Sequence, residues 1–123
     1  MSKKNILVIE DDENISELIE ESLSEYYSVI KAETGEQGIE KAISRNVSAV
    51  ILDIKLPGIS GWEVVRNFRK NPDIRNIPVI FLTAVSEMEI QQQAANSIVI
   101  KKPFDPEELL GTVNNVAGKN NEE

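Results

Sequence analysis

The stretch Ala49-Val50-Ile51-Leu52-Asp53, continuing into Ile54-Lys55-Leu56-Pro57-Gly58, decides the fold. A short apolar run that stops on a polar residue before a Pro-Gly turn is typical of a strand that is buried on both faces. Four other apolar runs of similar length occur along the chain, at Ile6–Ile9, Val29–Ala32, Val79–Leu82 and Ile98–Ile100. We therefore predict five strands, with Ala49–Leu52 as the third.

Helical periodicity fills the stretches between these runs. The apolar residues recur at the spacing of one helix face, in the sets Ile15, Leu18, Ile19 and Leu23; Ile39, Ala42 and Ile43; Val64, Val65 and Phe68; and Leu109, Leu110, Val113 and Val116. Helix starts are indicated by three capping boxes (Thr34 with Gln37, Ser60 with Glu63, Ser86 with Glu89) and by Asp105 before Pro106 and Glu108. Five strands alternating with five helices predict an α/β fold, a doubly wound parallel sheet with helices on both faces.

Length and composition set the class of protein. A chain of 123 residues with 41% hydrophobic and 28% charged residues is one globular domain, which we place at residues 1–118 before a polar tail at 119–123. It contains no cysteine and no histidine, so any metal must have oxygen ligands, which favours a hard ion such as Mg²⁺. A net charge of −8 argues against nucleic-acid binding. Without an apolar run of membrane-spanning length or a signal-peptide core, we expect a cytoplasmic protein with no membrane association.

Polar residues follow four of the predicted strands. Glu10-Asp11-Asp12 follows the first, Asp53 the third, Thr83 the fourth, and Lys101-Lys102-Pro103-Phe104 the fifth. Taken singly, these are ordinary helix-start acids, a turn aspartate, a capping threonine and a solvated lysine. Open parallel sheets, however, bind ligands at the carboxyl ends of their strands. Carboxylates, a hydroxyl and an ammonium gathered there suit a phosphoryl group on a carboxylate beside a metal ion.

Four motifs in this order resemble the receiver domain of two-component response regulators, in particular single-domain regulators of the chemotaxis kind. They are Ile6-Leu7-Val8-Ile9-Glu10-Asp11-Asp12, Asp53-Ile54-Lys55-Leu56-Pro57-Gly58-Ile59-Ser60-Gly61, Leu82-Thr83-Ala84 and Lys102-Pro103-Phe104. The resemblance covers essentially the whole chain. It implies a flavodoxin-like (βα)5 fold with strand order 2-1-3-4-5 and a cis Lys102–Pro103 bond.

The resemblance also implies the roles of the site residues. Asp53 matches the phosphoacceptor, Lys102 the lysine that contacts the phosphoryl oxygens, and Thr83 the switch hydroxyl. The ligands of Mg²⁺ (or Mn²⁺) would be Glu10, Asp11, Asp53 and the backbone carbonyl of Lys55. Asp12 follows the acidic pair and is not placed among the ligands.

Partners follow from the same resemblance. A histidine kinase or phosphotransfer protein would donate the phosphoryl group, and the signal would pass to an unidentified output protein through protein contacts. Only self-phosphorylation and self-dephosphorylation are implied, not enzymatic action on another substrate. We expect a monomer, with a dimer through the fourth helix, fifth strand and fifth helix as the alternative on activation. Since the chain ends just after the fifth helix, we expect a stand-alone regulator or a domain cut from a larger protein.

The chain departs from the family's pattern in two places. The segment from Thr83 to Lys102 is a few residues shorter than usual, so we expect a truncated fourth helix or a truncated link after it. Val99 stands where the family often has the aromatic partner of the switch threonine. Lys55 and Val85 flank the site, where we expect them to tune water access, and Trp62 is interpreted as a partly exposed packing residue.

Three alternative functions compete with this interpretation. A phosphatase with an aspartate nucleophile would carry a second aspartate two residues after Asp53, where this chain has Lys55. A dinucleotide-binding enzyme would need a glycine-rich turn after the first strand, where Glu10-Asp11-Asp12 would repel a pyrophosphate. The third alternative is a binding module that keeps the receiver fold without being phosphorylated.

Overall fold

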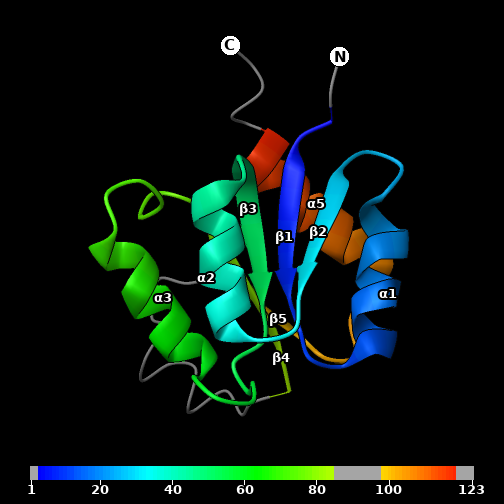
Figure 1. Cartoon of the computed structure of the whole chain (residues 1–123). Helices are drawn as coiled ribbons and strands as arrows, with labels where there is room; N and C mark the ends of the chain where they lie inside the picture. The colour runs from blue at the N-terminus through cyan, green and yellow to red at the C-terminus, as the bar shows by residue number, and fades with distance from the viewer. Residues whose placement is uncertain (1–2, 85–97, 119–123) are drawn as a thin grey trace.

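The computed structural model describes residues 3–84 and 98–118. Its sheet contains β1 (Asn5–Ile9), β2 (Ser28–Ala32), β3 (Val47–Leu52), β4 (Val79–Thr83) and β5 (Ile98–Lys101). All neighbouring strands are parallel, in the order β2-β1-β3-β4-β5 (Figure 1). The predicted strand order is therefore confirmed. Each strand is one or two residues longer than the apolar run that predicted it.

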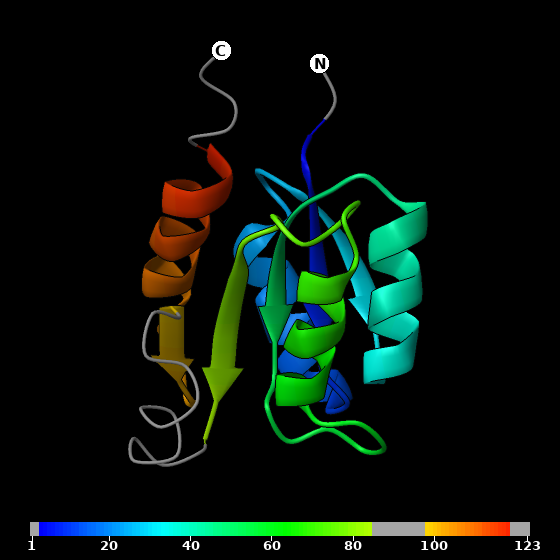
Figure 2. The same cartoon turned by 90° about the vertical axis from the view of Figure 1, so that its left-hand side faces the viewer.

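Four helices are described: α1 (Glu13–Leu23), α2 (Gly35–Ser44), α3 (Gly61–Lys70) and α5 (Pro106–Ala117). One face of the sheet carries α1 and α5, and the opposite face carries α2 and α3 (Figures 1 and 2). The doubly wound α/β architecture is thus confirmed. The predicted fourth helix with its Ser86–Glu89 capping box, Val85, and the polar tail all lie outside the described residues.

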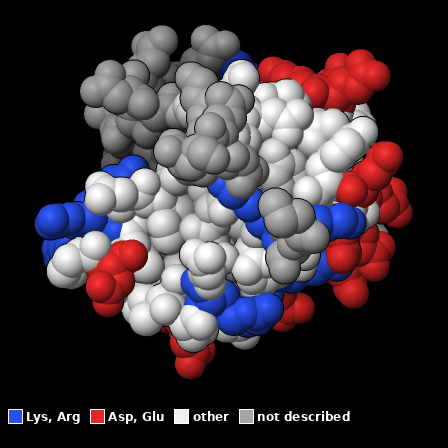
Figure 3. Space-filling view, turned by 90° about the horizontal axis from the view of Figure 1, so that it is seen from above, with Lys and Arg blue, Asp and Glu red and all other residues white. Residues whose placement is uncertain are grey.

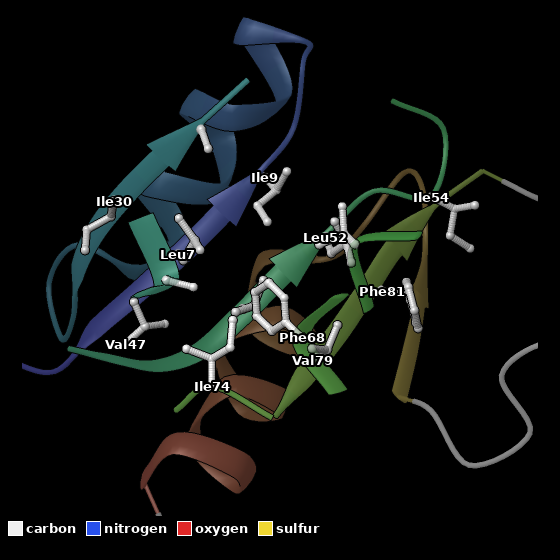
Figure 4. Packing of buried hydrophobic residues seen from close by; sticks show 14 residues of the cluster. Leu7, Ile9, Ile30, Val47, Leu52, Ile54, Phe68, Ile74, Val79 and Phe81 are labelled. Carbon is white, nitrogen blue, oxygen red and sulfur yellow. The ribbon is translucent and has the colours of Figure 1, made fainter. Parts of the chain in front are cut away.

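The core consists of two apolar layers, because alternate residues of a strand point to opposite faces of the sheet. The layer beneath α2 and α3 contains Leu7, Ile9, Leu52, Phe81 and, from α3, Val64 and Phe68 (Figure 4). The layer beneath α1 and α5 contains Ile6, Val8, Ile51, Ile80 and, from the helices, Ile19, Leu23, Leu109 and Val113. Burial on both faces explains why the strands have continuous rather than alternating apolar sequences.

The helix starts largely follow the predicted capping. Ser60 and Glu63 form a complete capping box at α3, and Asp105 accepts a hydrogen bond from the backbone N–H of Glu107 at α5. The predicted box at α2 is only half formed. Thr34 accepts from the N–H of Gln37 at 3.1 Å, but the Gln37 side chain accepts from the N–H of Glu33 rather than from that of Thr34.

Two residues of the predicted apolar stripes lie outside the buried helix faces. Leu18 is 53% exposed and Ile43 is 51% exposed. In α1 the buried residues are Ser16, Ile19 and Leu23, and Leu18 is turned away from Ile19 by the roughly 100° that separates consecutive helical residues. In α2 the buried residues are Gly35, Gly38 and Ala42. The buried face of α2 therefore consists of small residues, with Gly38 against Ile9 of β1, and Ile43 faces solvent.

Within residues 3–84 and 98–118, no helix has both the length and the apolar character needed to cross a membrane.

Candidate functional site

Glu10, Asp53 and Lys102 each come directly after a strand of the sheet. Their backbone N–H groups still donate to carbonyl oxygens of the neighbouring strands, with N···O distances of 3.0, 3.1 and 3.0 Å respectively. The ladder of hydrogen bonds therefore continues one residue past the strands and fixes the backbone from which each of the three side chains projects.

The Lys102 ammonium joins two buried carboxylates. Its Nζ lies 2.9 Å from Oε1 of Glu10 and 2.9 Å from Oδ2 of Asp53. Glu10 is 4% exposed and Asp53 is 7% exposed. The other oxygen of each carboxylate accepts a backbone N–H, from Asp12 at 3.1 Å and from Lys55 at 3.2 Å. Each carboxylate is therefore held by one amide and by the shared ammonium.

Burial and pairing act in opposite directions on the ionisation of this cluster. Burial raises the pKa of the Glu10 carboxyl above its usual range, against the hydrogen bonds from Lys102 and the Asp12 amide. Burial alone would lower the pKa of the Lys102 ammonium, but its hydrogen bonds to Glu10 and Asp53 outweigh this, so that pKa is raised. Lys102 is consequently a firmly protonated cation within the site.

The three consecutive acidic residues after β1 have different structural roles. Oxygens of Glu10, Asp11 and Asp53 lie within 4.8 Å of one another, and Asp11 is exposed. Asp12 is instead the N-cap of α1 and accepts from two backbone N–H groups of the first turn, at 2.9 and 3.3 Å. An all-oxygen donor set of this kind suits Mg²⁺ or Mn²⁺. The residues present therefore fit a divalent ion, and Asp12 lies outside the cluster.

Thr83 is the last residue of β4 and is fully buried. It is paired with Lys101 in the parallel ladder, and its carbonyl oxygen accepts the Lys102 N–H. Val99, at the position that is often aromatic in the family, lies opposite Phe81 and packs against the core layer beneath α2 and α3. The sheet thus brings the backbone of Thr83 beside that of Lys102.

Gly61 is a site residue that sequence reasoning did not assign. It is the first residue of α3, and its N–H donates to the carbonyl of Ile54 at 2.8 Å. A Cβ at this position would lie 2.5 Å from the Asp53 carbonyl oxygen and 2.7 Å from the Ile54 Cα. Only glycine lets α3 begin this close to the backbone of Asp53. The available signal was a glycine directly after the Ser60 cap.

Trp62, the second residue of α3, is partly buried as predicted. Its ring packs against that of Phe81, with centroids 5.0 Å apart and planes at 51°. The indole therefore rests on β4, two residues before Thr83, which makes its fluorescence a candidate reporter of the site.

A groove lies beside the cluster and reaches Lys102. It has a volume of about 670 Å³ between α1 and the start of α5, lined by Ile15, Leu18, Glu21, Ser22, Lys102, Pro103, Phe104 and Pro106. The Lys102–Pro103 bond, between two of its lining residues, is cis, as predicted. No single stretch of sequence signals this groove, because its two walls are about eighty residues apart along the chain.

Comparison with known proteins identifies the family. The model of the response regulator receiver domain matches residues 6–114. The chain is 41% identical over 112 residues to the uncharacterized transcriptional regulatory protein YrkP of Bacillus subtilis. The aligned region covers 88% of this chain and 47% of YrkP. Among solved structures, chemotaxis protein CheY4 of Vibrio cholerae is similar at a TM-score of 0.85 and 27% identity, covering 94% of this chain and 99% of that one.

A second similar structure is the BeF3-activated DrrB receiver domain, at a TM-score of 0.80 and 31% identity, covering 93% of this chain and 97% of that one. The chain spans about half the length, or less, of the curated relatives that it matches. The match over residues 6–114 and the strand order together bear out the resemblance noted in the sequence. This chain belongs to the response regulator receiver domain family.

Proposed function

We propose that this domain is a phosphorylation switch in which Asp53 accepts a phosphoryl group from a phosphohistidine of a histidine kinase or phosphotransfer protein. The observation that carries the proposal is the environment of the Asp53 carboxylate. It is buried, it is held through Oδ1 by the Lys55 amide, and its Oδ2 contacts the Lys102 ammonium next to two further acids. An anionic nucleophile oriented in this way is suited to in-line phosphoryl transfer.

In the transfer step, an Asp53 oxygen attacks the phosphorus and the P–N bond to the donor imidazole breaks. The products are an aspartyl phosphate and a free imidazole nitrogen. Lys102 stabilises the negative charge on the transferred oxygens as a fixed ammonium. Glu10, Asp11, Asp53 and the Lys55 carbonyl would hold Mg²⁺ or Mn²⁺, which when bound supplies further positive charge to the same oxygens.

Thr83 is suited to detect the phosphoryl group, because it ends the strand that lies beside Lys102. Its hydroxyl would donate to a phosphoryl oxygen and bias β4 and β5 toward an active arrangement. Hydrolysis of the acyl phosphate would return the domain to its resting state. The output would then be a change in contacts with a partner protein in the cytoplasm.

The groove beside α1 supports the approach of a protein donor. It leads from the exposed Leu18 to Lys102, so a helix seated there would bring a phosphohistidine to the edge of the site. Glu13, Glu17 and Glu21 of α1 are exposed. Acidic side chains also gather along the right-hand edge in Figure 3, which views the molecule from the end that carries the termini. A donor with basic residues around its histidine would suit this surface.

The decisive test is intact mass after incubation with acetyl phosphate and Mg²⁺, with wild type and Asp53→Asn compared. We expect one phosphoryl adduct in the wild type, none in the variant, and none when EDTA removes the metal. An adduct that persists in Asp53→Asn would move the acceptor to another residue. Absence of any adduct in folded wild type would favour the binding module that keeps the fold without phosphorylation.

A further inference from the structure

Basic side chains gather at the end of the sheet opposite Asp53, where the strands begin and both termini of the chain lie (Figure 1). In the described links that lead into the strands, the acidic residues are Glu25 and Asp73. The basic residues at this end, two of them in the last turn of α3, form what we call the basic face: Lys3, Lys4, Arg45, Arg69, Lys70 and Arg75. Figure 3 views this end and shows basic side chains at its left edge and across its middle and lower parts. A chain with a net charge of −8 is therefore locally positive here.

Part of this positive charge balances helix ends. The helices end on the basic face, and the carboxyl end of a helix carries partial negative charge. Nζ of Lys3 donates to the carbonyl of Ser24, just after α1, at 2.7 Å. Nζ of Lys4 donates to the carbonyl of Ala117, at the end of α5, at 3.2 Å. These two lysines are explained by the fold itself.

The other cations are not used up in this way. The exposed side chains of Arg45, Lys70 and Arg75 make no hydrogen bond or ion pair with the part of the chain that the structure describes. Arg69 donates through Nη1 to the Arg75 carbonyl at 2.9 Å, which holds the link after α3 beside the end of that helix. One cation for each helix end would balance α2 and α3, so Lys70 and Arg75 are in excess of that need.

A hollow of about 250 Å³ lies within the basic face. Its lining includes Ser48 of β3 and, from the link between α3 and β4, Asp73 and Asn76. Arg45 precedes Ser48 by three residues, and Arg75 directly precedes Asn76. The hollow therefore offers a hydroxyl and an amide between two arginines, with Asp73 as an acid in its lining.

We infer that the basic face docks a short acidic segment of a partner protein, with one carboxylate of that segment in the hollow. Cations that lack carboxylate partners, next to hydrogen-bonding side chains, are complementary to Asp and Glu side chains. A nucleic acid fits this surface less well, because its charge continues along its whole length and acidic side chains gather along the right-hand edge of the same view (Figure 3). The surface lies at the opposite end of the sheet from Asp53, so the inference does not rest on phosphorylation. A partner bound here would leave the edge around Asp53 open to a phosphodonor.

The test is fluorescence anisotropy at low salt with a labelled short peptide of alternating glutamate and serine. Arg45→Glu and Arg75→Glu should each raise the Kd of the wild type about fivefold, because each reverses a charge beside the hollow. The matched control is Lys55→Glu, which reverses an exposed charge at the opposite end of the sheet and should change the Kd less than about twofold. Asp73→Asn should lower the Kd about twofold, because it removes the acid from the lining.

Three outcomes would overturn the inference. The first is a folded wild type, checked by far-UV circular dichroism, that does not bind the acidic peptide. The second is equal weakening in Arg75→Glu and Lys55→Glu, which would assign the binding to net charge rather than to the basic face. The third is tighter binding of a short DNA duplex than of the peptide, which would make a nucleic acid the occupant. A peptide of alternating lysine and serine should not bind, and binding of it equal to that of the acidic peptide would likewise count against the inference.

Discussion

Gly61→Ala and Gly111→Ala make the same chemical change in two helices and should shift stability in opposite directions. A Cβ at Gly61 would lie 2.5 Å from the Asp53 carbonyl oxygen and 2.7 Å from the Ile54 Cα, and both of these atoms are backbone. At Gly111, which is exposed within α5, a Cβ would meet nothing within 4 Å. The pair therefore separates lack of space from helix propensity.

The magnitudes follow from these contacts. Forcing a methyl group into a packed site costs about 1–3 kcal/mol, and the α3 start cannot move away without losing the hydrogen bond from the Gly61 amide to Ile54. Replacing an exposed mid-helix glycine by alanine gains about 1 kcal/mol. We therefore expect the two variants to differ by about 2–4 kcal/mol in the free energy of unfolding. For a domain of this size, each kcal/mol of stability corresponds to roughly 3–5 °C in melting temperature.

Urea unfolding followed by far-UV circular dichroism measures this difference, with equal m-values as the control for two-state behaviour. Since the Asp53 carbonyl is the contact that a Gly61 side chain would displace, Gly61→Ala should also take up phosphoryl groups from acetyl phosphate more slowly. A Gly61→Ala protein that is as stable as wild type, or stabilised like Gly111→Ala, would refute the close-approach reasoning.

Three further predictions concern the site and its surroundings. Leu18→Asp in the groove should slow phosphoryl transfer from a protein phosphodonor at least about fivefold, while uptake from acetyl phosphate stays unchanged. The control is Ile43→Asp, at a position of α2 that is equally exposed. Equal slowing in both variants would show that the groove does not bind the donor. Lys55→Ala should change the lifetime of the acyl phosphate in a radiolabel chase, because its exposed side chain flanks Asp53; an unchanged lifetime would exclude this role. Asp12→Ala should cost about 0.5–2 kcal/mol in urea unfolding through the lost N-cap and leave Mg²⁺ affinity nearly unchanged, whereas Asp11→Ala should do the reverse.

The strands were predictable because burial on both faces leaves a continuous apolar run that few other structures produce. The residues at which the strands end were less predictable. Thr83 and Lys101 are polar, yet they close β4 and β5, because each forms the last pair of the same ladder. The last residue of a strand depends on which neighbouring strand pairs with it, and a single stretch of sequence does not contain that information.

Helix faces were predicted less well than helices. The apolar spacing located α1 and α2 correctly, but it did not show that Ser16 in α1 and Gly38 in α2 would be buried. A Cβ at Gly38 would lie 2.3 Å from the Ile9 side chain of β1, so this position needs a small residue, and a stripe defined only by hydrophobicity overlooks such residues. Leu18 and Ile43 were therefore assigned to the buried side and lie half exposed.

At the site, the sequence predicted which residue types meet, because strand ends of a parallel sheet share one edge. It did not predict that Lys102 would bridge Glu10 as well as Asp53. That bridge depends on the reach of three side chains across neighbouring strands, and only coordinates reveal it. The close approach of Gly61 was missed for the same reason.

The extension of the hydrogen-bond ladder to Glu10, Asp53 and Lys102 has a consequence for amide exchange. An N–H that belongs to a central sheet exchanges with solvent only when the whole domain opens, whereas those of loops exchange through small local motions. The amides of Glu10 and Asp53, which follow the inner strands β1 and β3, should therefore be among the slowest to take up deuterium, while the amide of the exposed Gly58, a few residues along the loop after Asp53, exchanges early. Sequence changes in that loop can then alter how fast the switch runs without moving the charges on which it depends.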